Sequence, residues 1–119
     1  MVSIKYTKEF EDWFSGQDEG AKILVHAKVM VLKEFGHNLG RPHADTIKGS
    51  RYKNLKELRI KHRKYVLRIL FIFDVNRNCW LLIGGSKKGK NEGDFYGKLI
   101  KRAEGLIVKY PQIQEGKDG

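Results

Sequence analysis

The chain has 119 residues, a size that fits one domain able to bury a core without metal or disulfide support. Apolar residues make up 40% of the sequence and charged residues 32%, as in soluble globular proteins, and no apolar run reaches the ~18 residues of a membrane span. The N-terminus lacks the apolar stretch of a signal peptide. The single cysteine, Cys79, lies in an apolar run and is predicted to be a buried thiol. We therefore expect a single cytoplasmic domain over residues 1–119, with no membrane partner.

The positive charge of the chain is concentrated in one segment. The formal net charge is +10, and residues 48–68 hold nine lysines and arginines against one acid, Glu57, a net of +8. The first 36 residues hold five basic and six acidic residues, a net of −1. A basic face concentrated on a small domain is typical of proteins that bind a polyanion, most often a nucleic acid.

The N-terminal part predicts a strand and two helices. Residues 2–6 alternate between apolar and polar side chains, which indicates a short strand. Thr7 and Asp18 are suitable N-caps, and each precedes apolar residues at helical spacing. Gly16 and Gly36 stand where the two helices would end. We expect the two helices to form an antiparallel pair.

A loop, three strands and a helix are predicted to follow. Residues 38–54 contain glycines and a proline but few apolar side chains, so we expect a long ordered loop there. Strands are predicted at residues 55–61, 65–74 and 79–86. The second of these is almost wholly apolar, which indicates a central strand buried on both faces. Apolar residues at helical spacing then predict a closing helix over residues 95–107.

These elements predict an α+β fold. The three strands would form an antiparallel meander, with the two N-terminal helices and the C-terminal helix covering one face. Residues 111–119 begin with a proline and are polar, so we expect them to form a flexible tail.

The first predicted hairpin places basic side chains opposite one another. With its tip at residues 62–63, Glu57 would lie opposite Arg68, and Lys61 opposite Lys64. The first pair would be a structural ion pair, which is one interpretation of Arg68. The second pair would be repulsive, and an anionic partner would relieve that repulsion. An ordinary solvated hairpin is the alternative.

The second predicted hairpin adds a third cation to the same face. With its tip at residues 76–77, Arg68 would lie opposite Gly85. Together the two registers gather Arg59, Arg68 and Lys87 on one face of the sheet, where the glycine leaves open space. A change of one residue at either turn would move these side chains to the other face.

The sequence has no pattern for a metal site, a phosphate-binding loop, a dinucleotide fingerprint or a nucleophile elbow, so we predict no metal and no cofactor. Among reactions on nucleic acids, cleavage of RNA without a metal is still compatible with the sequence, because the 2′-hydroxyl of RNA is itself a nucleophile. Arginine suits the dianionic phosphorane of that reaction, and lysine can transfer a proton. Tyr52, Tyr65 or Tyr96 could orient the 2′-hydroxyl or stack on a base. His62 could act as acid or base, although a hairpin tip favours an exposed role.

Six runs of sequence, taken in order, carry a resemblance to a known family: residues 7–14, 39–51, 54–59, 67–74, 82–89 and 95–96. With these runs the chain closely resembles the RelE/ParE toxin superfamily, in its HigB-like, phage Gp49-related branch. The resemblance implies a RelE-like fold of the microbial-ribonuclease type and a toxin of a type II toxin–antitoxin pair. Such toxins cleave mRNA, commonly in the ribosomal decoding site. Their partner in this branch is a helix-turn-helix antitoxin encoded beside the toxin.

The resemblance also implies roles for single residues. Arg59 and Arg68 match the arginines that hold the scissile phosphate. Lys87 matches a lysine that serves as base or phosphate ligand, and Tyr96 matches an aromatic position of the site. Ser86 departs from the pattern, because this branch commonly has an acid there. We further expect seven basic side chains to bind RNA phosphates: Lys48, Arg51, Lys53, Lys61, Arg63, Lys64 and Lys88.

Three functions are compatible with these features. The leading hypothesis is a metal-independent, ribosome-dependent mRNA endonuclease, an mRNA interferase that blocks translation. The second is a ParE-like toxin that binds gyrase, and the third is a non-catalytic RNA-binding or ribosome-binding module. The joint presence of Arg59, Arg68 and Lys87 favours the nuclease.

Overall fold

The computed structural model describes residues 1–113. In chain order the elements are β1 (Ile4–Tyr6), α1 (Lys8–Ser15), α2 (Glu19–Phe35), the short 3₁₀ helix η1 (Gly36–Asn38), β2 (Ala44–Thr46), β3 (Lys56–His62), β4 (Tyr65–Phe73), β5 (Cys79–Ser86) and α3 (Glu92–Lys109). Ile113 is buried beside α3, and the rest of the predicted tail, residues 114–119, lies outside the described residues. None of the helices within residues 1–113 is long and apolar enough to cross a membrane.

The two N-terminal helices begin and end where the sequence predicts. The side chain of Thr7 accepts a hydrogen bond from the N–H of Phe10, and Asp18 accepts one from Ala21. Each bond satisfies a donor that the first helical turn leaves unpaired. Gly36 follows α2 with a φ of 53°, in the region of backbone space that favours glycine. The predicted N-caps and the predicted end of α2 are therefore confirmed.

The five strands form one sheet in the order β1-β5-β4-β3-β2. Strands β2 to β5 pair in antiparallel fashion, whereas β1 pairs in parallel with β5. The predicted meander of three long strands is confirmed, and the α+β class with it. Strand β2 lies inside the segment predicted to be a loop, where three residues are too few to show an alternating pattern.

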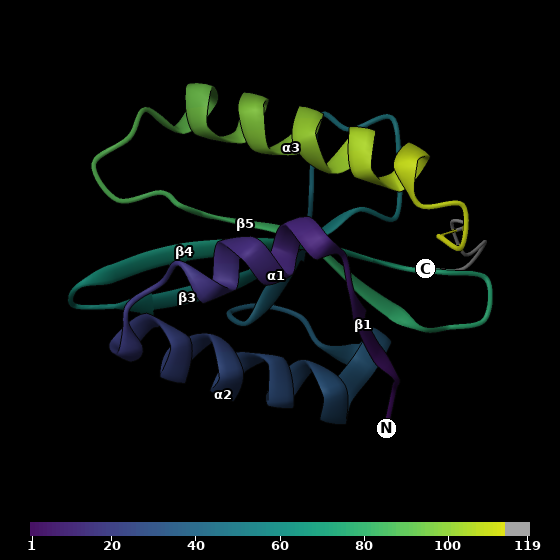
Figure 1. Cartoon of the computed structure of the whole chain (residues 1–119), viewed down its shortest axis with the longest axis horizontal. Helices are drawn as coiled ribbons and strands as arrows, with labels where there is room; N and C mark the ends of the chain where they lie inside the picture. The colour runs from purple at the N-terminus through teal and green to yellow at the C-terminus, as the bar shows by residue number, and fades with distance from the viewer. Residues whose placement is uncertain (114–119) are drawn as a thin grey trace.

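Helices cover both faces of the sheet, with α3 on one side and α2 on the other (Figure 1). Phe10 of α1 and Leu32 of α2 belong to the core cluster of one face, and Leu99 of α3 belongs to that of the other. The prediction that helices cover one face is therefore wrong. Ile69 and Leu70 are neighbours in β4 and are both fully buried. Because neighbouring strand residues point to opposite faces, their burial requires cover on both.

The β3–β4 hairpin is displaced by two residues from its predicted register. Arg59 lies opposite Arg68 and Glu57 opposite Leu70, because the turn falls at residues 63–64. The predicted opposition of Glu57 and Arg68 is wrong. A displacement of two residues nevertheless keeps every side chain on its face, so Glu57, Arg59 and Arg68 still share one.

The β4–β5 hairpin places Arg68 opposite Gly85, as predicted, but this register depends on a β-bulge that the sequence did not reveal. Near the turn the two strands are one residue away from the predicted register, and a β-bulge between Leu70 and Phe71 restores it. Without this bulge Arg68 would lie opposite Gly84, and the positions of β5 beyond it would change face.

Candidate functional site

A cleft of about 480 Å³ opens between the sheet and the first turns of α3. Arg59 of β3, Lys87 beyond the end of β5 and Tyr96 of α3 line it, together with Glu57. The structure thus brings three of the four predicted catalytic residues to one cavity from three separate segments. The fourth residue, Arg68, is not among the lining residues and contacts two of them, Tyr96 and Glu57.

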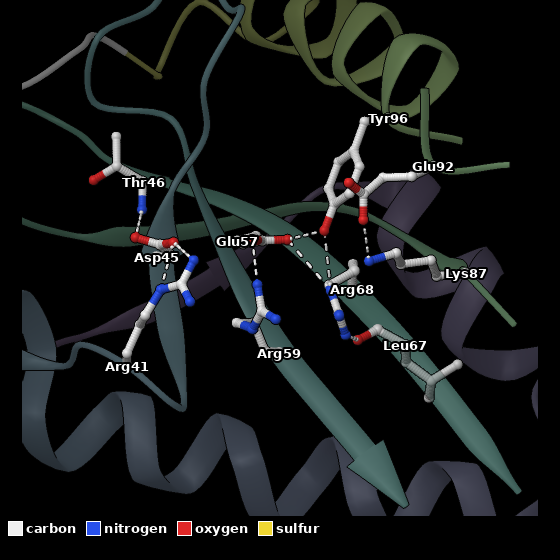
Figure 2. Close-up of polar contacts among 10 residues, drawn as sticks. All are labelled: Arg41, Asp45, Thr46, Glu57, Arg59, Leu67, Arg68, Lys87, Glu92 and Tyr96. Carbon is white, nitrogen blue, oxygen red and sulfur yellow. Dashed lines mark hydrogen bonds and ion pairs between the residues drawn. The ribbon is translucent and has the colours of Figure 1, made fainter. Parts of the chain in front are cut away.

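Glu57 lies at the centre of the polar network beneath this cleft (Figure 2). Its side chain is nearly buried, and the residue is 5% exposed. Tyr96 Oη donates to Glu57 Oε1 at 2.6 Å, and Arg59 Nη1 donates to Glu57 Oε2 at 3.0 Å. Arg68 Nε lies 3.4 Å from Glu57 Oε1 as an ion pair. One carboxylate therefore holds both arginines and the tyrosine in place.

Arg68 is buried, with 3% of its surface exposed. Its Nε donates to Tyr96 Oη at 3.1 Å, and its Nη1 donates to the carbonyl of Leu67 at 3.0 Å. These contacts agree with the alternative interpretation of Arg68 as a structural partner of Glu57. In this conformation Arg68 contacts Tyr96 and Glu57, which line the cleft. Direct contact between Arg68 and a phosphate stays a prediction.

Tyr96 is held as a neutral hydrogen-bond donor. Partial burial raises the pKa of its phenol above the ordinary value of 10.0, and the hydrogen bond to Glu57 raises it further. The side chain lies in the second turn of α3, which Asn91 caps by accepting from the N–H of Asp94 at 3.1 Å. The cap fixes the start of α3 and thereby the height of Tyr96 above the sheet.

Lys87 is paired with an acid that the sequence analysis did not select. Its Nζ lies 2.7 Å from Glu92 Oε1 and 5.4 Å from the centre of the Tyr96 ring. The hydrogen bond from Lys87 lowers the pKa of Glu92 below its ordinary value of 4.5. The side chain of Glu92 is 72% exposed, so the lysine is covered by a carboxylate that can rotate into solvent.

A second ion pair stands at the rim of the cleft. Arg41 Nη2 lies 2.7 Å from Asp45 Oδ2, and this contact lowers the pKa of Asp45. Asp45 of β2 lies opposite Glu57 of β3, a pair of like charges that is unfavourable by itself. Arg41 and Arg59 each neutralise one of these two acids, so the arginines let both carboxylates stand side by side.

The residues predicted to bind RNA are all exposed, and they form two groups around the cleft: Lys61, Arg63, Lys64 and Lys88 near the β3–β4 turn, and Lys48, Arg51 and Lys53 in the loop before β3. Lys48 of the second group lines the cleft itself. Lys88 Nζ donates to the carbonyl of Lys64 at 3.3 Å, which joins the two turns of the first group.

Lys61 lies opposite Val66 and not opposite Lys64, so the predicted repulsive pair is wrong, for the same displaced register. The loop of the second group is anchored to α3, because Glu104 Oε2 accepts from Ser50 Oγ at 2.8 Å and from the N–H of Arg51 at 3.1 Å.

Within residues 1–113, no three His, Cys, Asp or Glu side chains are grouped so that they could hold a metal ion.

Comparison with known proteins identifies the family. Residues 12–107 match the family described as "Phage derived protein Gp49-like (DUF891)", and the match contains all four predicted catalytic residues. HigB3 of Mycobacterium tuberculosis, a protein named as a toxin, is 38% identical over 88 residues, which cover 74% of this chain and 75% of HigB3. The chain belongs to the Gp49-like, HigB-like toxin family.

Two more relatives extend this comparison. HigB2 of Mycobacterium tuberculosis, also named as a toxin, is 38% identical over 112 residues. The match covers 91% of this chain but 55% of HigB2, so the chain spans about half the length of that relative. The isolated E. coli RelE toxin has the same fold, with a TM-score of 0.58 over 86% of this chain and 98% of RelE, at 12% identity. The RelE-like fold that the sequence implied is therefore confirmed.

Proposed function

We propose that this toxin is a ribosome-dependent mRNA endonuclease of a type II toxin–antitoxin system. The observation that carries the proposal is the convergence of Arg59, Lys87 and Tyr96 on one cleft, where Glu57 holds Arg59 and Tyr96 in place. Such a set suits RNA, because the substrate brings its own nucleophile and mainly requires orientation and charge stabilisation.

Arg59 is the residue that we assign to the scissile phosphate. Its side chain is 28% exposed, and one of its N–H groups is engaged by Glu57. The guanidinium has further donors in a planar fork, which suits the equatorial oxygens of a phosphorane. Arg68 adds positive charge from beneath, and Glu57 keeps the two arginines in fixed orientations.

Lys87 and Tyr96 are the residues that we assign to proton transfer and to orientation of the 2′-hydroxyl. Tyr96 remains protonated at neutral pH, and because its one proton is donated to Glu57, its oxygen can accept a hydrogen bond from the 2′-hydroxyl. Lys87 becomes available when Glu92 rotates away, and its ammonium can then give a proton to the leaving 5′ oxygen, while the proton of the attacking 2′-hydroxyl passes to solvent water. The products would be a 2′,3′-cyclic phosphate or its 3′-phosphate and a new 5′ end, and the reaction would need no metal.

The partners follow from the same proposal. The two basic groups flanking the cleft would bind phosphates of mRNA or ribosomal RNA, and the ribosome would present the mRNA in a fixed geometry. A helix-turn-helix antitoxin would be the inhibitor, and the cytoplasm would be the site of action.

The test is induced expression in bacteria, followed by mapping of new 5′ ends on mRNA. We expect cuts in phase with codons for the wild type, and a loss of about 10²–10³-fold in cleavage for Arg59→Ala. Lys87→Ala should also lose cleavage. Lys101→Ala is the matched control, because it removes a positive charge from an exposed position of α3 outside the cleft.

Three results would count against the proposal. Growth arrest that persists in a folded Arg59→Ala variant would rule out Arg59 as the ligand of the scissile phosphate. Arrest with intact mRNA and a DNA-damage response would indicate gyrase as the target. Salt-dependent RNA binding without any cleavage would indicate a non-catalytic module.

A further inference from the structure

A second cleft, of about 660 Å³, lies on the other flank of α3 from the candidate site. Its floor is the glycine pair of β5, Gly84 and Gly85, and Trp13 of α1 and Phe95 of α3 form its aromatic walls. A Cβ on Gly84 would come within 2.5 Å of the Trp13 indole, and one on Gly85 within 3.1 Å of the Phe95 ring. The two glycines therefore allow both rings to lie against the strand.

The charges around this cleft are mainly positive. Lys90, Lys98 and Arg102 line it together with one acid, Asp94, and all four residues are exposed. Lys90 Nζ lies 5.8 Å from the centre of the Phe95 ring, in the range of a cation–π contact. Aromatic surface and cations thus occur side by side.

We propose that this cleft binds an unpaired nucleobase of RNA against Trp13, with the adjoining phosphates held by Lys98 and Arg102. The inference rests on the proposed function in that RNA is the ligand. Stacking of bases on aromatic side chains beside a basic groove is the way in which proteins bind single-stranded nucleic acid. The cavity also lies within the range of about 300–1,000 Å³ that small-ligand sites occupy.

The position of the second cleft supports this occupant. Gly85 in its floor pairs across the sheet with Arg68, which lies beneath the first cleft. The two clefts therefore lie side by side near the start of α3, so one strand of RNA could contact both. An acidic peptide would use the cations but would have no need of the aromatic wall, which is why we assign the cleft to RNA.

The experiment is a fluorescence titration of the whole protein with a single-stranded 2′-O-methyl oligoribonucleotide, which cannot be cleaved. Trp80, the other tryptophan, is buried and donates to Asp74 Oδ2 at 3.0 Å, so a change in emission would report on Trp13. We expect quenching in the wild type. The Trp13→Phe variant should lose the signal while keeping an aromatic wall.

Charge variants test the phosphate contacts. Lys98→Ala and Arg102→Ala should each weaken binding about threefold or more and reduce the slope of log affinity against log salt by about 0.7. Lys101→Ala removes the same charge from the same helix outside the cleft and should leave both quantities unchanged.

Unchanged Trp13 emission would overturn the proposal, as would an equal loss of affinity in Lys101→Ala. Quenching by poly-glutamate without quenching by RNA would also overturn it and would assign the cleft to an acidic protein. Because the probe cannot be cleaved, quenching that persists in Arg59→Ala would support this site even if the protein proved not to be a nuclease.

Discussion

Two carboxylates are buried in the same sheet with contrasting partners. Asp74, at the β4–β5 turn, is 3% exposed and accepts from the N–H groups of Asn76 and Asn78 at 2.8 and 2.9 Å, and from Trp80 Nε1 at 3.0 Å. All of these donors are neutral and lie within six residues. Glu57 instead binds two arginines and a tyrosine, and that tyrosine is 39 positions away in the sequence.

The contrast separates a carboxylate that builds a turn from one that organises a site. Burial acts to raise the pKa of Asp74, but the hydrogen bonds from Asn78 and Trp80 outweigh it and lower the pKa below its ordinary value of 3.8. Asp74 thus needs no cation. Glu57 is paired with one buried arginine, Arg68, and one partly exposed arginine, Arg59, and burial of the Glu57–Arg68 pair costs desolvation free energy that an apolar contact would avoid. The role proposed for Glu57, which is to hold Arg59 at the cleft, would account for this cost.

The largest expected effect is that of Glu57→Gln. The amide keeps the shape of the side chain but leaves Arg68 buried without its counter-charge, so we expect the free energy of unfolding to fall by about 3 kcal/mol. Cleavage per folded molecule should fall as well, because Arg59 and Tyr96 lose the group that orients them. Urea unfolding and cleavage by the folded fraction measure the two effects. Full activity of the folded variant would show that Glu57 has only a structural role.

Asp74→Asn should have a smaller and purely structural effect. The amide nitrogen would face a donor instead of accepting from it, and we expect a loss of about 1–2 kcal/mol in the free energy of unfolding. Cleavage per folded molecule should equal that of the wild type, because Asp74 does not line the cleft. A specific loss of activity in this variant would break the distinction between the two carboxylates.

Part of this pattern could be predicted from the sequence. Capping residues and long apolar strands depend on local chemistry, so the starts of α1 and α2 and the central strands were predicted correctly, whereas α3 begins three residues before its predicted start. The displaced β3–β4 register and the bulge at Leu70 depend on packing that no local pattern records. Glu57 was singled out only as a partner of Arg68, although it is the only acid in residues 48–68 and was therefore a visible candidate for the centre of a basic site.

Two further acids of the site were missed for different reasons. Glu92 stands four residues before Tyr96 on a helix, a spacing that places both on one face and could have identified it. Asp45 reaches the cleft through the short strand β2, which the sequence does not reveal. Long-range pairing thus determines which acids neutralise which cations, and spacing along the chain determines only some of them.

A third prediction uses pH to compare Asp74 with its variant. The pKa of Asp74 is lowered in the folded protein, so its stabilising effect is present above about pH 3.8 and is lost as the pH falls through the folded pKa. The difference in unfolding free energy between wild type and Asp74→Asn should therefore shrink in acid. Urea unfolding at a series of pH values measures this difference. A difference in unfolding free energy that stays constant with pH would show that the charge of Asp74 does not stabilise the fold.

Both proteins should still lose stability in acid for a second reason. The hydrogen bonds from Lys109 and Tyr110 lower the pKa of Glu9 from 4.5 to about 2. Its contribution is present above pH 4.5 and is lost as the pH falls toward 2, in the wild type and in Asp74→Asn alike. In the Glu9→Gln variant, the unfolding free energy should therefore fall less between pH 4.5 and pH 2 than it does in the wild type.

The smallest expected effect concerns the exposed acid of the site. Glu92 occupies the position on Lys87 that a phosphate would take, and its side chain is well exposed, so the pair is weak and screened by solvent. Removing the charge in Glu92→Gln should therefore raise the affinity for a 2′-O-methyl oligoribonucleotide by about two- to fivefold, chiefly at low salt. Glu34→Gln removes an exposed charge from the end of α2 and is the control. If both variants gain equally, the effect is one of net charge, and Glu92 does not compete with RNA for Lys87.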